Sequence, residues 1–255
     1  MTGFYCIMNR QILGENMQEK KQSKTKRFFK QISYAILPFF IFVAVLLVTY
    51  FGNQLIYNLR GGNYGSNYPE IPLDSQVPLI PWFVYFYYLT FPLGLITFFY
   101  LAYKNKKAFY DIFLTLVISF AVSGIVYLFA QTYFVKPDFI PESFTDWLVV
   151  WTWGSTNPVN VFPSQHCFMA FATILAVFHG GKGINKVYKF VATILAIMVI
   201  LSTIFIRQHY IMDIFASFDI MLIAFGIVLL FGWGSKMKKR QEEKTFKRMM
   251  KKKKA

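Results

Sequence analysis

The sequence predicts an all-α membrane protein in which six transmembrane helices form one bundle and both termini lie in the cytoplasm. Two observations carry this prediction: the composition of the chain and the placement of its basic residues. Hydrophobic residues make up 56% of the 255 residues and charged residues only 15%, which is far from the average soluble domain. A bilayer core of ~30 Å is crossed by ~20 apolar residues in a helix. A helix is required there because backbone polar groups in lipid must pair internally.

Six apolar stretches are candidates for these helices. They span residues 32–51, 78–103, 108–134, 164–180, 187–206 and 211–233, and the fourth is the shortest. The first is too long for the apolar core of a signal peptide and no small-residue cleavage motif follows it, so we expect it to be retained. The chain therefore divides into a basic cytoplasmic tail (1–30), a six-helix membrane domain (31–233) and a second basic cytoplasmic tail (234–255).

The basic residues predict the orientation of the helices. All but three of the 27 Lys and Arg residues precede the first stretch or follow the second, fourth or sixth stretch. The positive-inside rule places these regions, and with them both termini, in the cytoplasm. Only Arg60, Lys136 and Arg207 lie on the other side. The net charge of +15 reflects this asymmetry and does not predict a nucleic-acid partner. The basic C-terminal segment is expected to fix the topology, or alternatively to hold anionic lipid headgroups.

Two longer segments are predicted on the extracytoplasmic side. The first, residues 52–81, is rich in Gly, Asn, Tyr and Pro, which favour turns and irregular cover. We expect a generic loop, with a lid or substrate entrance as the alternative. The second, residues 135–163, contains three Trp residues. Cys6 and Cys167 fall on opposite sides of the predicted membrane, so no disulfide is expected between them.

The stretch 206–213 (IRQHYIMD) contains a candidate nucleophile. His209 and Asp213 are four residues apart, so on a helix they lie on one face within hydrogen-bonding reach. A carboxylate that holds Nδ1 of an imidazole leaves Nε2 free, fixed in tautomer and more basic. A structural ion pair at a helix start is the alternative interpretation. Asp219 is expected to be buried in the sixth predicted helix and to need a partner or water there, because an intramembrane carboxylate is costly.

A second candidate group stands at the start of the fourth stretch. Pro163 and Ser164 are favoured in or just before the first turn of a helix. A helix start offers free N–H groups and a partial positive charge, so the backbone and Ser164 could hold a phosphate there. His166 is then expected to face the same place. The third histidine, His179, lies at the other end of this stretch and is interpreted as a helix-end or interface residue.

In a six-helix topology these groups lie on one side of the membrane. The end of the third stretch, the start of the fourth and the junction between the fifth and sixth are all extracytoplasmic. We therefore expect one pocket at the outer leaflet that contains Lys136, Ser164, His166, Arg207, His209 and Asp213.

The order of Lys136-Pro137, FPSQH (162–166) and RQHYIMD (207–213) resembles the type 2 phosphatidic acid phosphatase superfamily, over residues 32–233. The superfamily motifs are Lys-x6-Arg-Pro, Pro-Ser-Gly-His and Ser-Arg-x5-His-x3-Asp. The matching residues are Pro163, Ser164, His166, Ser202, His209 and Asp213.

The chain departs from these motifs at four positions. Phe129 and Lys136 stand at the Lys and Arg positions of the first motif, Gln165 replaces Gly, and Thr203 replaces Arg. The pattern is more similar to the branch with inositol phosphorylceramide synthase-like and sphingomyelin synthase-like proteins. Arg207 is expected to replace the missing Arg, which requires a non-helical turn before His209.

The resemblance implies a metal-independent lipid phosphate phosphatase that acts at the extracytoplasmic leaflet of the cell membrane. His209 would attack phosphorus to form a phosphohistidine, His166 would protonate the leaving alcohol, and Asp213 would orient His209. Implied phosphate-binding residues are Lys136, Ser164, Gln165 and Arg207. No metal or other cofactor is expected, so activity should survive a chelator.

The expected partners are a lipid phosphate, such as phosphatidic acid, phosphatidylglycerophosphate or an isoprenoid phosphate, and membrane lipids. Two alternatives remain open. The first is a lipid phosphotransferase, in which an alcohol replaces water as the acceptor. The second is a non-catalytic lipid carrier or scaffold, in which His209→Asn would leave function intact.

Overall fold

A computed structural model describes residues 25, 28–29, 31–60, 70–155, 159 and 162–254 of the chain. Most of the predicted N-terminal tail, including Cys6, lies outside these residues. In the described part the chain is helical, without a β-strand, which confirms the all-α prediction. The helices are α2 (Ile36–Leu59), α3 (Val84–Lys104), α4 (Lys106–Phe129), α5 (Phe144–Gly154), α6 (Gln165–His179), α7 (Lys186–Phe205), α8 (Ile211–Leu230) and α9 (Trp233–Lys254).

Among the described residues, five helices are long and apolar enough to cross a membrane. They are α2, α3, α4, α7 and α8, the first two lengthened by a 3-10 turn at their start. The sixth predicted helix, α6, is apolar but has only 15 residues, which is short of the ~20 that a bilayer core requires. The structure is therefore that of a multi-pass membrane protein, with α6 as a shorter apolar helix inside the bundle.

Two predicted helix boundaries are wrong. The first stretch was expected to end at residue 51, but α2 continues to Leu59 because the chain stays free of Pro and keeps apolar residues at helical spacing. The third was expected to reach residue 134, but α4 ends at Phe129. Beyond it the chain is extended, and Tyr133 forms an isolated antiparallel bridge with Val159.

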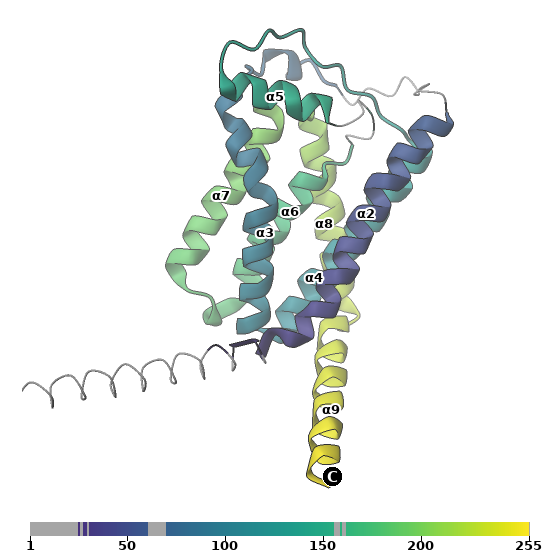
Figure 1. The fold of residues 1–255 in the computed structure, drawn as a ribbon, viewed down its shortest axis with the longest axis vertical. Helices are drawn as coiled ribbons and strands as arrows, with labels where there is room; N and C mark the ends of the chain where they lie inside the picture. The colour runs from purple at the N-terminus through teal and green to yellow at the C-terminus, as the bar shows by residue number, and fades with distance from the viewer. Residues whose placement is uncertain are drawn as a thin grey trace, which may run out of the picture.

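The short helix α6 is the centre of the bundle (Figure 1). It packs against α3, α4, α7 and α8, and its first turn is capped by the Ser164 side chain, which accepts a hydrogen bond from the Cys167 N–H at 3.3 Å. Cys167 is buried as a free thiol. Small side chains such as Ala172 and Ala176 are buried along α6, which allows its neighbours to approach closely.

Helix α5 lies across one end of the bundle (Figure 1). It starts at a capping box between Ser143 and Asp146 and is tied to the bundle by Trp153, whose Nε1 donates to the carbonyl of Ile206 at 2.9 Å. The segment 135–163, which contains three Trp residues, was predicted only to lie on the extracytoplasmic side, and its helix was not predicted. We call this end of the bundle the outer end, after its predicted side.

The opposite end, here the inner end, carries the turns between α3 and α4 and between α6 and α7, together with α9 (Figure 1). Asp111 of α4 is buried there and accepts hydrogen bonds from Lys107 and His179, both at 2.8 Å. His179 is thus an interface residue, as expected. The described part of the predicted C-terminal tail is helical and forms most of α9.

We expected Asp219 to be buried in the bundle, and this prediction is wrong. Asp219 is on an exposed face of α8, so a partner or water for its carboxylate would have to come from outside the helices packed around α6.

Candidate active site

The turn between α7 and α8 sets the position of His209. Residues 206–210 are not helical. The carbonyl of Thr203, near the end of α7, accepts hydrogen bonds from the N–H groups of Gln208 and His209 at 3.1 and 3.0 Å. Arg207 has a left-handed backbone with φ of 51°, which a non-glycine residue adopts only when its surroundings hold it there. The turn thereby brings the His209 side chain back toward the bundle.

His209 and Asp213 form a buried pair. Nδ1 of His209 lies 2.8 Å from Oδ2 of Asp213, and the same oxygen accepts the N–H of Tyr210 at 3.1 Å. The exposed fraction is 8% for His209 and 0% for Asp213. Because Asp213 engages Nδ1, Nε2 is the ring nitrogen that remains for a substrate.

His166 faces this pair from the first turn of α6. Its ring is stacked on Tyr87 of α3, with 4.0 Å between the ring centroids and 26° between the planes, and Phe91 packs edge-on at 5.7 Å. The centroids of the His166 and His209 rings are 6.1 Å apart. The two rings are thus close enough for both to contact one phosphoryl group, since reacting atoms lie about 3 Å apart and a hydrogen bond also spans about 3 Å.

Both histidines line one cavity of about 360 Å³, a volume within the usual range for ligand pockets. Its walls come from α2, α3, α4, α5, α6 and the turn between α7 and α8. Since α6 is shorter than its neighbours, its first turn starts inside the bundle, and Trp151 and Thr152 of α5 form part of the wall. In the described part of the chain, no group of three or more His, Cys, Asp or Glu residues is arranged to hold a metal ion.

The predicted phosphate-binding residues are placed differently from one another. Gln165 lines the cavity beside His166. Ser164 is fully buried behind it, where its hydroxyl caps α6 and its carbonyl accepts the Ser217 hydroxyl at 3.0 Å. The phosphate-binding role of Ser164 stays a prediction. Its observed part in the fold is to hold the start of α6 against α8.

Arg207 points away from the larger cavity. The turn before His209 is not helical, as the predicted role of Arg207 requires, but the guanidinium donates to the carbonyl oxygens of Asp74 (2.9 Å), Ser75 (3.5 Å) and Val77. With Asp74 and His209 it lines a separate hollow of about 10 Å³, while the described lining of the larger cavity does not include it. In this structure Arg207 fixes a loop.

Lys136 lies in the extended segment that follows α4. The neighbouring Phe134 ring packs on Tyr210, with 4.5 Å between centroids, and the Val135 N–H reaches the Tyr210 hydroxyl at 3.5 Å. Lys136 is half-buried, and this burial lowers its pKa to about 8. It is not among the described residues of the cavity wall, so its contact with a phosphate stays a prediction.

Asp74 is a structural residue of the site that the sequence analysis missed. It is buried, with Oδ1 accepting the N–H of Ile211 at 2.8 Å and Oδ2 accepting the N–H of Ile71 at 2.8 Å. Asp74 thus satisfies the first turn of α8. The sequence showed only an acidic residue in a predicted outer loop, on the side of the membrane where few basic residues lie. This does not identify the helix start that Asp74 contacts.

The fold is that of a helical membrane protein with two histidines in one cavity, and a family comparison adds to this description. Residues 112–237, which include every predicted site residue, match the sequence model of the PAP2 superfamily. The match confirms the predicted resemblance to this superfamily over that segment. Comparisons with curated proteins and with solved structures return no match.

The family match is shorter than the predicted resemblance, which began at residue 32. It starts inside α4, so α2 and α3 lie outside it, although Tyr87 and Phe91 of α3 surround His166. Members of the PAP2 superfamily are typically phosphoesterases or phosphotransferases. The family thus suggests a phosphatase or phosphotransferase type of activity on lipid phosphates.

Proposed function

We propose that the protein is a metal-independent lipid phosphate phosphatase that acts at the extracytoplasmic leaflet through a phosphohistidine intermediate. One observation carries the proposal: His166 and His209 line the same cavity with 6.1 Å between their ring centroids, and Asp213 holds Nδ1 of His209. The position of the cavity beneath α5, at one end of an apolar bundle, supports a lipid headgroup as the bound group.

In the first step, Nε2 of His209 attacks phosphorus of the lipid phosphate. A phosphorus–nitrogen bond forms as the bond between phosphorus and the lipid oxygen breaks, and His166 donates a proton to the leaving oxygen. The Asp213 carboxylate supports the positive charge that develops on the His209 ring. Gln165 and the free N–H groups at the start of α6 donate hydrogen bonds to the phosphoryl oxygens and stabilise their negative charge.

In the second step, water attacks phosphorus of the phosphohistidine. His166, now neutral, takes the proton of this water as the phosphorus–nitrogen bond breaks. Inorganic phosphate leaves and both histidines return to their starting states. The cycle needs no metal, so we expect EDTA to leave the rate unchanged.

The test is phosphate release by the purified protein from phosphatidic acid in detergent micelles, compared with His209→Asn. We expect the variant to lose nearly all activity, since removing the nucleophile removes the covalent route. His179→Asn is the matched control, because His179 also pairs with a buried aspartate but lies at the inner end. Equal phosphate release by wild type and His209→Asn would overturn the proposal in favour of a carrier or scaffold.

A phosphotransferase is the second candidate, and Asn53 of α2 favours it. Asn53 lines the cavity, and its Oδ1 is buried with no hydrogen-bond partner in the described part of the chain. Such an oxygen is available to accept a hydrogen bond from the hydroxyl of an acceptor alcohol. Phosphate release from phosphatidic acid measured with and without added inositol distinguishes the two, because a transferase would form inositol phosphate and release less inorganic phosphate.

A further inference from the structure

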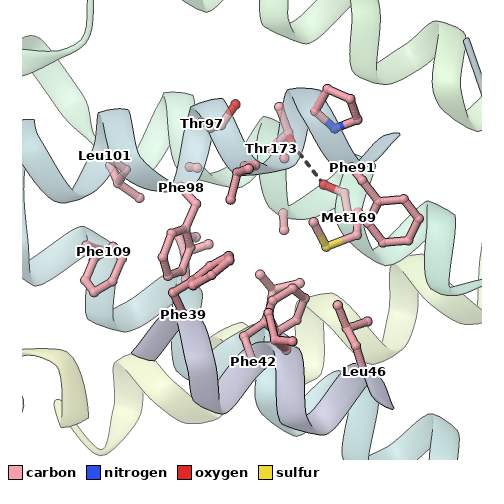
Figure 2. A pocket seen from close by; sticks show the side chains of 18 residues that line it. Phe39, Phe42, Leu46, Phe91, Thr97, Phe98, Leu101, Phe109, Met169 and Thr173 are labelled. Carbon is pink, nitrogen blue, oxygen red and sulfur yellow. Dashed lines mark hydrogen bonds between the residues drawn. The ribbon is translucent and has the colours of Figure 1, made fainter. Parts of the chain in front are cut away.

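A second cavity lies next to the one that holds the histidines, on the side toward the inner end of the bundle. It has a volume of about 430 Å³ and lies between α2, α3, α4 and α6. Figure 2 shows its length, with Leu101 and Phe109 at one end and Phe91, Met169 and Leu46 at the other. We call it the apolar cavity.

The apolar cavity adjoins the candidate active site at one residue. Phe91 lines both cavities, and its ring packs edge-on against His166 at 5.7 Å. A molecule with its head between His166 and His209 therefore needs to pass only Phe91 to place its tail in the apolar cavity.

The apolar cavity runs toward the inner end and stops there. On α3 its lining extends from Phe91 to Leu101, which is about 15 Å along a helix, or about half of the ~30 Å bilayer core. Its floor is made of buried side chains, since Leu101, Phe109 and Ala176 are only 1–2% exposed.

The lining has almost no polar group to offer a ligand. The hydroxyls of Thr97 and Thr173 are used inside the fold, where they donate to the carbonyls of Leu93 and Met169 at 2.8 and 3.0 Å. Water is held only where several polar partners are available, whereas an apolar cavity of about 150 Å³ stays dry and accepts a hydrocarbon. This cavity is larger and has the same chemistry, so a hydrocarbon is its matching occupant.

The width of the apolar cavity depends on Gly94 and Met169. A Cβ on Gly94 would collide with Cε of Met169, so the absence of a side chain at position 94 makes room for the Met169 thioether. Figure 2 shows Met169 beside Phe91 at the outer end. Methionine is unbranched and adapts to irregular spaces, which suits a position that a chain must pass.

We propose that the apolar cavity binds the hydrocarbon chain of the lipid phosphate and that its floor limits the length of the chain. The proposal rests on the proposed function for the place of the phosphate. It deepens that function by assigning one extended chain of the substrate to this cavity, running inward past Phe91.

A groove between α2 and α4 is the competing place for the chain. It has a volume of about 560 Å³ and shares Asn53 and Tyr127 with the candidate active site. Both spaces open to the surroundings on one side, the groove at Ile125 and Leu128 (57% and 41% exposed) and the apolar cavity at Phe91 and Leu95 (51% and 43% exposed). The apolar cavity ends at a floor of buried side chains, whereas Tyr127 is the one buried residue in the described lining of the groove. We therefore expect no selection for chain length in the groove.

The first experiment compares kcat/KM for octanoyl, lauroyl and palmitoyl lysophosphatidic acid in wild type, Ala176→Phe and Ala121→Phe. Ala176 lines the floor of the apolar cavity and Ala121 lines the groove, so the same change fills one space or the other. In an apolar pocket one methylene too many costs about tenfold or more. We expect Ala176→Phe to lower the palmitoyl-to-octanoyl ratio at least about tenfold and Ala121→Phe to leave the ratio as in wild type.

An unchanged ratio in Ala176→Phe would overturn the proposal, and so would a change confined to Ala121→Phe. Ile112→Ala, which enlarges the apolar cavity, is expected to shift the ratio the other way and keeps the test valid if Ala176→Phe does not fold.

The second experiment measures binding without turnover. His209→Asn is irradiated with a palmitoyl lysophosphatidic acid whose terminal carbon bears a diazirine, and the labelled peptides are identified. We expect labels at the floor of the apolar cavity, on residues such as Leu101, Phe109 and Ala176. Labels confined to residues that line only the groove, such as Val48, Ile125 and Leu128, would overturn the proposal. Labels in the expected place on a protein whose wild type releases no phosphate would refute the phosphatase and support the chain site.

Discussion

At the scale of single residues, the site depends on two rings that are fixed in different ways. His209 is fixed by a hydrogen bond, since Asp213 is fully buried and 2.8 Å from Nδ1. His166 is fixed by packing against Tyr87 and Phe91. Spacing along a helix made the first contact predictable. The second was not predictable, because α3 contains many aromatic residues and nothing local distinguishes the two that meet His166.

Lys136 provides a test by pH. Burial lowers its pKa from 10.5 to about 8, so its ammonium is charged below about pH 8. If it holds a phosphoryl oxygen, as predicted, kcat/KM falls as pH rises through about 8. We expect Lys136→Arg to keep activity to higher pH, since guanidinium stays charged. A pH–rate profile of both proteins checks this.

The same pKa shift has the opposite effect on stability. The unfolded chain binds more protons at Lys136 than the folded chain does between about pH 8 and 10.5, so this residue makes the folded state more stable as pH rises across that window. Tm is therefore measured across the same pH window in wild type and Lys136→Arg. If Tm of the wild type falls with activity as pH rises, and Lys136→Arg removes both effects, our assignment of the pKa shift to burial is contradicted.

At the scale of elements, the loop before α3 and the turn between α7 and α8 hold one another. Asp74 accepts the Ile211 N–H at the start of α8, and Arg207 donates to the Asp74 carbonyl at 2.9 Å. In addition, the Ile80 N–H donates to the Phe205 carbonyl at 2.9 Å. The loop has a composition that predicts only turns, so these long-range contacts were not predictable from sequence, and Arg207 was assigned to phosphate instead.

Arg207→Ala distinguishes the two roles of this side chain. Charged hydrogen bonds of this kind contribute about 2 kcal/mol, so we expect Tm to fall by roughly 4–8 °C, at about 2–4 °C per kcal/mol for a chain of this size. Thermal unfolding in detergent measures this, and KM for a lipid phosphate is measured on the folded fraction. An unchanged Tm with a large rise in KM would instead favour direct phosphate binding by Arg207.

The contact between α4 and α9 depends on the absence of a side chain at position 234. A Cβ on Gly234 would lie 2.9 Å from the Lys107 carbonyl oxygen and closer still to the Asp111 carboxylate. We expect Gly234→Ala to lower the free energy of unfolding by about 1–3 kcal/mol, because Asp111 would have to leave Lys107 or His179. Gly226→Ala is the control, since a Cβ there meets nothing within 4 Å. Equal Tm values for the two variants would contradict this account.

At the scale of the whole molecule, the composition and the lengths of the apolar stretches predicted the helical membrane bundle. The family match confirms the predicted family resemblance. Each of the six predicted stretches overlaps one helix of the bundle, though α6 is too short to count among the five spans. The sequence did not predict α5 as a helix or the apolar cavity. Both arise from how helices distant in the chain pack together, which local patterns do not record.

The two-ended bundle makes the orientation testable. If the cytoplasm holds the basic clusters, Glu142 before α5 lies outside the cell and Glu243 of α9 lies inside. Both are exposed. In a Cys6→Ser background, with Cys167 buried, we expect Glu142→Cys to react with an impermeant maleimide on intact cells and Glu243→Cys only after permeabilisation. The reverse pattern would place the histidine cavity at the cytoplasmic leaflet and require a lipid phosphate presented there. Equal reaction at both positions on intact cells would contradict a bundle with one end on each side of the membrane.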